Sequence, residues 1–93
     1  MILEIVSPEA KLFSGEVTSV TVPGVDGSFQ ILNNHAPIVS TLEKGTVKIA
    51  ASSFNFSKEV ADKFSKVNDQ TYTLEITSGT IEMKDNKVIV LVD

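Results

Sequence analysis

The stretch YTLEITSGTIEMKDNKVIVLV, residues 72–92, contains three short runs that are rich in β-branched side chains. The predicted strands are 72–77, 80–84 and 88–92, with turns at Ser78-Gly79 and Asp85-Asn86. The last run, VIVLV, has no polar face. We therefore expect both of its sides to be covered.

The same pattern extends through most of the chain, which holds twelve Val, eight Ile and eight Thr. β-Branched residues favour strands, and turn signals recur at a spacing of about ten residues. Further strands are predicted at 2–6, 17–22, 28–32, 38–42 and 46–51, with turns at 13–15, 23–27, 33–37 and 43–45. This spacing is typical of an all-β sandwich or barrel. With 93 residues and no linker, we expect one domain, residues 1–93.

Residues 52–69 interrupt the strand pattern. Ser57 is a suitable N-cap, and Val60, Phe64 and Val67 recur at the i, i+4, i+7 spacing of one helical face. The spacing predicts a short helix near residues 57–66. The alternative is an elongated hairpin arm with Phe54 and Phe56 on one face.

Composition excludes several classes of function. The net charge is −4, and all eight basic residues are lysines, so a nucleic-acid partner is not expected. There is no cysteine, which excludes disulfides and thiolate metal sites, and a single histidine excludes a multi-histidine site. No run approaches the roughly 18 apolar residues of a membrane span. The N-terminus lacks the basic region of a secretory signal, so we expect the chain to stay where it is made.

Three features could carry chemistry. Residues 24–27, GVDG, resemble a phosphate-binding loop, but no GKS or GKT follows and no helix is predicted after them, so a turn is favoured. His35 could be a general base, but no nucleophile motif accompanies it, and we expect it to fix its loop by hydrogen bonds. The twelve carboxylates are scattered without calcium-loop spacing. We therefore predict no catalytic residue, metal or cofactor, and a function in binding through the surface.

Several ordered motifs closely resemble one family, the ε subunit of bacterial F-type ATP synthase, called δ in mitochondria. The motifs are Phe13-Ser14-Gly15, Pro23-Gly24-x-x-Gly27-x-Phe29-Gln30-Ile31-Leu32-x-Asn34-His35-Ala36-Pro37, Leu42-x-x-Gly45-x-Val47-Lys48-Ile49, Ser78-Gly79-Thr80-Ile81-Glu82 and Asn86-x-Val88-x-Val90-Leu91-x-Asp93. The match covers residues 1–51 and 71–93, and residues 52–70 are longer than the matching hairpin of typical members. The resemblance implies a two-sheet β-sandwich of about ten short strands.

The resemblance also implies a role and partners. Family members are non-catalytic rotor subunits of the central stalk: they bind the γ subunit, contact the ring of membrane c subunits, and couple proton flow to ATP synthesis. The implied location is the cytoplasmic face of the bacterial inner membrane, with membrane contact only through the complex. The resemblance implies a c-ring contact at Asp26, Gly27, Ser28, Asn34 and His35, in two loops expected to lie together at one end. It implies a γ contact at Ser7, Leu12, Phe13, Ile38, Val39 and Ser40.

Typical members continue into a C-terminal helical hairpin that inhibits ATP hydrolysis and, in some species, senses ATP. This sequence stops at Asp93, so we expect the hairpin to be absent, and with it both activities. Two other functions stay open. The chain could be a stand-alone β-sandwich binding module, which an exposed aromatic platform would support, or a small hydrolase that uses His35 in a triad.

Overall fold

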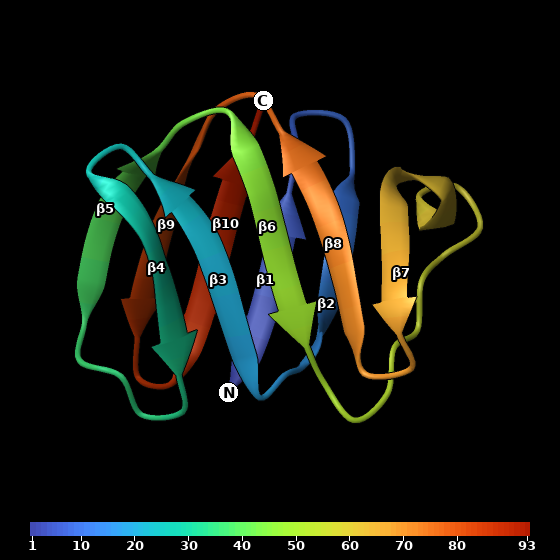
Figure 1. The fold of residues 1–93 in the computed structure, drawn as a ribbon, viewed down its shortest axis with the longest axis horizontal. Helices are drawn as coiled ribbons and strands as arrows, with labels where there is room; N and C mark the ends of the chain where they lie inside the picture. The colour runs from blue at the N-terminus through green and yellow to red at the C-terminus, as the bar shows by residue number, and fades with distance from the viewer.

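The computed structural model describes all residues, 1–93, and contains ten strands and one short 3₁₀ helix (Figure 1). Its elements are β1 (Ile2–Val6), β2 (Lys11–Glu16), β3 (Ser19–Gly24), β4 (Gly27–Leu32), β5 (Ile38–Leu42), β6 (Gly45–Ala50), η1 (Ala61–Lys63), β7 (Phe64–Asn68), β8 (Thr71–Ile76), β9 (Gly79–Lys84) and β10 (Lys87–Val92). Strands β1 and β5 have the predicted bounds. Strands β4, β6, β8, β9 and β10 differ from the prediction by no more than one residue at either end.

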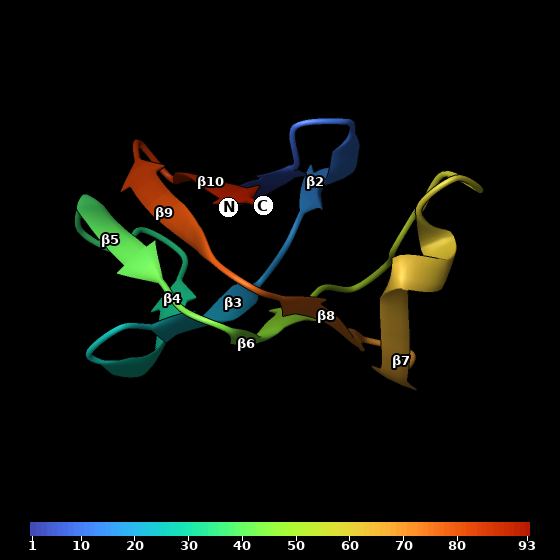
Figure 2. The ribbon, with the colours of Figure 1, turned by 90° about the horizontal axis from the view of Figure 1, so that it is seen from above.

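The ten strands form one curled sheet that folds over into two layers. The order is β2-β1-β10-β9-β5-β3-β6-β8-β7, with β4 on the free side of β3. Strands β5 and β3 are joined by one residue pair, Gly24 with Leu42, and the sheet turns over at that point. We call β2-β1-β10-β9-β5 layer one and β4-β3-β6-β8-β7 layer two; Figure 2 shows them from above as two facing layers. The predicted all-β sandwich of about ten strands is confirmed.

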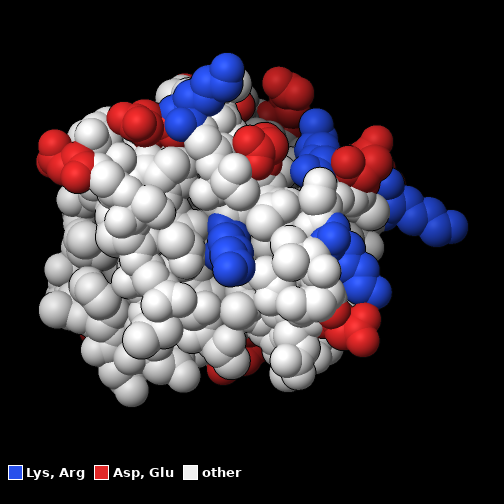
Figure 3. Space-filling view, viewed as in Figure 1, with Lys and Arg blue, Asp and Glu red and all other residues white.

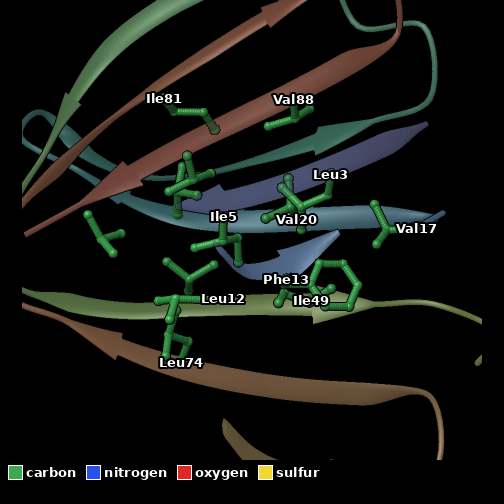
Figure 4. Packing of buried hydrophobic residues seen from close by; sticks show 14 of the residues in the cluster. Leu3, Ile5, Leu12, Phe13, Val17, Val20, Ile49, Leu74, Ile81 and Val88 are labelled. Atoms are coloured by element: carbon green, nitrogen blue, oxygen red, sulfur yellow. The ribbon is translucent and has the colours of Figure 1, made fainter. Parts of the chain in front are cut away.

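The core fills the space between the layers. It contains 22 buried hydrophobic residues and no buried polar side chain. Inward positions alternate along the central strands, as with Leu3 and Ile5 on β1 (Figure 4) and with Val20 and Val22 on β3. Fully burying one such side chain contributes about 1.5–3 kcal/mol, so the cluster is the main source of stability.

The first and last strands lie side by side in layer one. β1 pairs with β10 in parallel, from Ile2 with Lys87 to Val6 with Leu91, while every other strand pair is antiparallel. The two ends of the chain therefore lie at opposite ends of the sandwich (Figure 1). Layer one can be completed only when β10 has joined β1.

Two local predictions were wrong. The expected turn at 13–15 lies inside β2, because the Phe13 ring enters the core and β2 pairs with β1. The expected helix near 57–66 is reduced to the three residues of η1. Phe64 instead begins β7, which pairs with β8, so tertiary pairing overrides a weak local helix preference.

The alternative hairpin arm for residues 52–69 is half right. Strands β7 and β8 form a hairpin, but Phe54 and Phe56 precede it, in the irregular segment 51–60. Both rings pack against the core, and Val60 is buried there as well. The segment thus crosses from layer two toward β2, and its aromatic rings close the open side of the sandwich.

The prediction that both sides of β10 are covered was also wrong within this chain. Val88, Val90 and Val92 are buried between the layers. On the other side, Ile89 is only half-buried and the Leu91 side chain is 51% exposed. No element of the chain covers this outer side.

We expect Gly79→Ala to destabilise the domain by about 1–3 kcal/mol, the usual range for overpacking a well-packed site. A Cβ atom at Gly79 would collide with the carbonyl oxygen of Leu91 on the neighbouring strand β10. Gly27→Ala is not a suitable control, because Gly27 has a φ of 123°. Thr80→Ala, one residue further along β9 and exposed, serves instead and should cost much less. Urea unfolding measures both, and equal stability of the two variants would contradict the close approach.

Candidate interaction surfaces

The five residues predicted to contact a c-ring do not form one cluster. Asp26 lies in the turn between β3 and β4, near the end of β5, where the Val25 amide donates to the Thr41 carbonyl at 3.2 Å. Asn34 and His35 follow the other end of β4, near Asn86 in the β9–β10 turn. The expectation that these loops lie together was therefore wrong. A two-residue turn reverses the chain into β4, whose six residues separate the loops (Figure 1).

The loop after β4 is held by several hydrogen bonds. The Asn34 amide, in a backbone with φ of 62°, donates to Asn86 Oδ1 at 2.8 Å. The His35 amide donates to the Leu32 carbonyl at 3.2 Å, and His35 Nδ1 lies 2.7 Å from the Ala36 carbonyl oxygen. The Met1 nitrogen donates to Asn33 Oδ1 at 2.7 Å. The imidazole is exposed and bonds within its own loop, as expected for a loop-fixing histidine.

The six residues predicted to contact γ divide into accessible and inaccessible ones. Leu12 and Phe13 are only 6% and 5% exposed, so their side chains belong to the core and not to a surface that γ could contact. Ser7, Ile38 and Ser40 are half-buried, and Val39 is 76% exposed. On β5 alternation explains the division, because Val39 points out of layer one while Ile38 and Ser40 face the core. On β2 the consecutive residues Leu12 and Phe13 are both buried, beside the register shift between β1 and β2.

The structure adds an apolar surface that the resemblance did not single out. The register places Leu91 of β10 directly beside Val6 of β1, with Ile89 two residues before Leu91 on the same side. Ile2 and Val39 lie on the same side, at the β1 and β5 positions of the layer. We call this surface the outer face of layer one. The all-apolar run 88–92 was its signal in the sequence, because a strand with no polar side needs a cover on both sides.

Charged groups lie among these apolar residues. Glu4 Oε2 is 3.4 Å from Lys11 Nζ, and Glu4 Oε1 is 3.4 Å from Lys87 Nζ. The positive charge of Lys87, with a smaller effect from Lys11, lowers the pKa of Glu4 from its usual value. Such exposed pairs contribute little to folding. On an interface they restrict which partner charges fit.

A shallow groove runs along the β5 side of this face. It has a volume of about 230 Å³ and is lined by Pro37, Ile38, Val39, Glu82, Met83 and Lys84. Val39 stands at one wall, and Glu82 is its cross-strand neighbour. The groove could receive an aliphatic side chain of a partner, flanked by one acidic and one basic group.

The opposite side of the molecule differs in character. Figure 3 shows the face of layer two, where charged side chains gather along the upper edge and the right side, one basic side chain stands near the centre, and the lower left is almost uncharged. Lys48 lies on β6 between Thr21 of β3 and Thr73 of β8. Of the six exposed large apolar residues, three lie on the outer face of layer one, namely Ile2, Val39 and Leu91. The other three lie in the β3–β4 turn or on strands of layer two, namely Val25, Leu32 and Val67.

The aromatic residues do not form an exposed platform. Five of the six pack together, with ring centroids 4.4 Å apart for Phe56 and Phe64 and 4.6 Å apart for Phe54 and Tyr72. Phe13 joins this group from β2, so the cluster links the two layers. Phe29, the sixth aromatic residue, is half-buried against the core. This arrangement gives no support to a stand-alone module that binds ligands on aromatic rings.

None of the helices is long and apolar enough to span a membrane. No three side chains of His, Asp or Glu gather in a way that could hold a metal ion.

The fold and the outer face of layer one together define a β-sandwich with one uncovered apolar side. Comparison with known proteins gives its family. Residues 1–61 match the family described as "ATP synthase, Delta/Epsilon chain, beta-sandwich domain". The chain is 38% identical over 91 residues to the ATP synthase epsilon chain of Chlorobium limicola, covering 98% of this chain and 86% of the relative. The chain belongs to the delta/epsilon family of ATP synthase subunits.

Other relatives are longer. The ATP synthase epsilon chain of Leptospira borgpetersenii is 36% identical over 91 residues, and the chain spans only 59% of its length. Among solved structures, a chain in the mitochondrial ATP synthase of Euglena gracilis has the same fold, with a TM-score of 0.74 at 16% identity over 99% of this chain and 49% of that one. A chain in the central stalk and c-ring structure from Tetrahymena thermophila gives 0.68 at 19% identity, over 98% and 61%. The prediction of a non-catalytic subunit of an ATP synthase is confirmed by the family.

Proposed function

We propose that this chain is a rotor subunit of the central stalk, and that it binds γ through the outer face of layer one. One observation carries the proposal: the outer side of β10 is apolar and uncovered, although β10 is a central strand of its layer. A permanent partner explains such a surface, because contiguous apolar patches are uncommon on monomers. Val6, Ile89 and Leu91 form its centre, and Val39 lies toward its border on β5. Ile38 and Ser40 pair with the core residues Met83 and Ile81 and therefore face inward, so of the predicted β5 contacts we retain Val39, together with half-buried Ser7 after β1.

The solved relatives support the stalk position. The Tetrahymena structure is titled as a central stalk and c-ring, and that of Euglena as an assembly of OSCP, F1 and c-ring. Both are similar in fold to this chain. By this family likeness we place it between γ and the c-ring, on the cytoplasmic face of the bacterial inner membrane, with membrane contact only through the complex.

The sandwich suits a mechanical role. Its ten strands belong to one continuous sheet, and no buried side-chain nitrogen or oxygen lacks a hydrogen-bond partner. Close-packed interiors have low compressibility and transmit strain. A domain held by γ on one face and by the c-ring on another would therefore turn as a unit, residues 1–93, with the ring.

The c-ring contact would be elongated. Because Asp26, Gly27 and Ser28 lie at one end of β4 and Asn34 and His35 at the other, we place this contact along the β4 side of the molecule. Almost the whole segment 25–37 is exposed, with Phe29 half-buried and Ile31 buried.

The predicted absence of an inhibitory arm and of ATP binding stays a prediction.

Asp26→Lys should weaken coupling in a salt-dependent way without unfolding the domain. Asp26 is exposed in a turn, and a charge at the rim of an interface is worth about 0–1 kcal/mol. Proton pumping driven by ATP in the assembled complex, measured across ionic strengths, checks this. Asp26→Asn, which removes the charge without reversing it, is the matched control and should have the smaller effect. Equal pumping by both variants and the wild type at every ionic strength would count against a contact at Asp26.

Add-back to the cognate ATP synthase tests the proposed role as a whole. A complex purified without this subunit should hydrolyse ATP with poor proton pumping, and adding the purified chain should restore the pumping. Full coupling in the absence of the subunit, or no recovery after its addition, would refute the rotor role.

A further inference from the structure

Three strands have a partner on one side only: β2 and β7 at the ends of the sheet order, and β4 beside β3. Two of them carry the features that discourage pairing with another chain. β2 has Lys11 and Glu16 and a register shift opposite Ile5 and Val6, and β7 has Lys66 and a shift between Lys66 and Asn68. Strand β4, GSFQIL, has no charge, no proline and an unbroken register of six pairs with β3.

The backbone groups on the free side of β4 follow from the hairpin register. Pro23 pairs with Ser28, and its carbonyl accepts from the Glu43 amide at 2.8 Å, so Pro23 faces away from β4. Antiparallel pairs alternate between bonded and non-bonded, so Gln30 and Leu32 share the orientation of Ser28. Their N–H groups, and the carbonyls of Ser28 and Gln30, face the free side. None of these groups makes a hydrogen bond outside the strand ladder.

The side chains of β4 would also allow a further strand to pair with its free side. Ser28, Gln30 and Leu32 are exposed and uncharged on the outside of layer two. Phe29 points inward but is only half-buried, beside the place where a further strand would run. A strand added there would use the free backbone groups and cover the Phe29 ring.

We propose that β4 is completed in the assembled enzyme by an extended segment of the c-ring, the partner that the proposed function places along β4. The free N–H and C=O groups require an extended backbone, and the side chains require a segment without charge that places an apolar residue beside Phe29. This inference rests on the proposed function, since the proposed c-ring contact brings the partner to this edge. It adds a strand pairing to the contact along β4.

Hydrogen exchange of single amides tests the pairing in the wild-type chain. The amides of Ser28, Gln30 and Leu32 should exchange quickly in the isolated subunit and at least about tenfold more slowly in the assembled ATP synthase, because hydrogen bonding protects amides from exchange. Unchanged exchange at all three in a complex that retains the subunit would overturn the proposal. Protection in the isolated chain that rises with its concentration would identify a second copy as the occupant and also overturn it.

Gln30→Pro tests the same contact by removing one N–H from the free side. Proline is tolerated on an edge strand where its nitrogen faces outward, so the fold should persist. Gln30→Ala removes the same side chain and keeps the N–H. We expect the proline variant to dissociate from the complex roughly tenfold faster than the alanine variant. Equal dissociation would refute the pairing. Failure of the wild type itself to assemble would refute the proposed function instead.

Discussion

Phe13→Ala should lower the free energy of unfolding by about 3–5 kcal/mol, the usual effect of removing a buried aromatic side chain. Phe13 is 5% exposed, and its ring centroid lies 6.1, 5.7 and 6.4 Å from those of Phe54, Phe56 and Phe64. The substitution would leave a cavity between β2 and the segment 51–60. Urea unfolding of the isolated chain measures the loss.

Ser14→Ala is the matched control, because Ser14 is the next residue on β2 and is exposed. It should change stability by less than about 0.5 kcal/mol, as is usual for a surface substitution. A near-normal stability of Phe13→Ala, together with weakened γ binding, would instead make Phe13 an interface residue and contradict its place in the core.

Leu91→Glu should weaken γ binding by roughly a hundredfold, equivalent to about 3 kcal/mol, because it places an unpaired charge in the middle of an apolar interface. The side chain is 51% exposed in the isolated chain, so its melting temperature should change little. Titration of the purified variant with the cognate γ subunit measures the affinity for γ, and thermal unfolding measures the melting temperature.

Val67→Glu provides the comparison for this variant. Val67 is 59% exposed on β7, at the far end of layer two. The substitution Val67→Glu therefore introduces the same charge away from the outer face of layer one. It should bind γ as the wild type does. Equal affinity of both variants would show that γ binds elsewhere, and an unfolded Leu91→Glu would be replaced by Val39→Glu, on the same face and 76% exposed.

Local alternation was enough to predict most of the sheet. Strands β1 and β5 were placed with their observed bounds, because both are short runs rich in β-branched and other apolar residues that turn residues flank. The all-β class followed from the same pattern.

The predicted secondary structure was wrong where contacts between residues distant in the sequence determine it. Phe13 reads locally as part of a turn, yet the pairing of β2 with β1 and the rings of Phe54 and Phe56 hold it in a strand. Val60, Phe64 and Val67 have helical spacing, but the open edge of β8 draws Phe64 into β7 and leaves Val67 exposed. A local window of sequence shows neither the pairing of β2 with β1 nor the open edge of β8.

The site was predicted only in outline. The five residues predicted for the c-ring contact are exposed, but the prediction that their two loops lie together at one end was wrong, because β4 separates them. The uncovered outer side of β10 was visible in the sequence as an apolar strand. Only the register showed that Val6 and Leu91 adjoin on a face that nothing in the chain covers.

Calorimetric titration of the purified chain into the cognate γ subunit tests the central claim most directly. The account predicts saturable binding at one chain per γ, with a negative heat-capacity change from burial of the apolar face around Leu91. No saturable heat with a folded γ subunit, or binding that Leu91→Glu leaves unchanged, would contradict it.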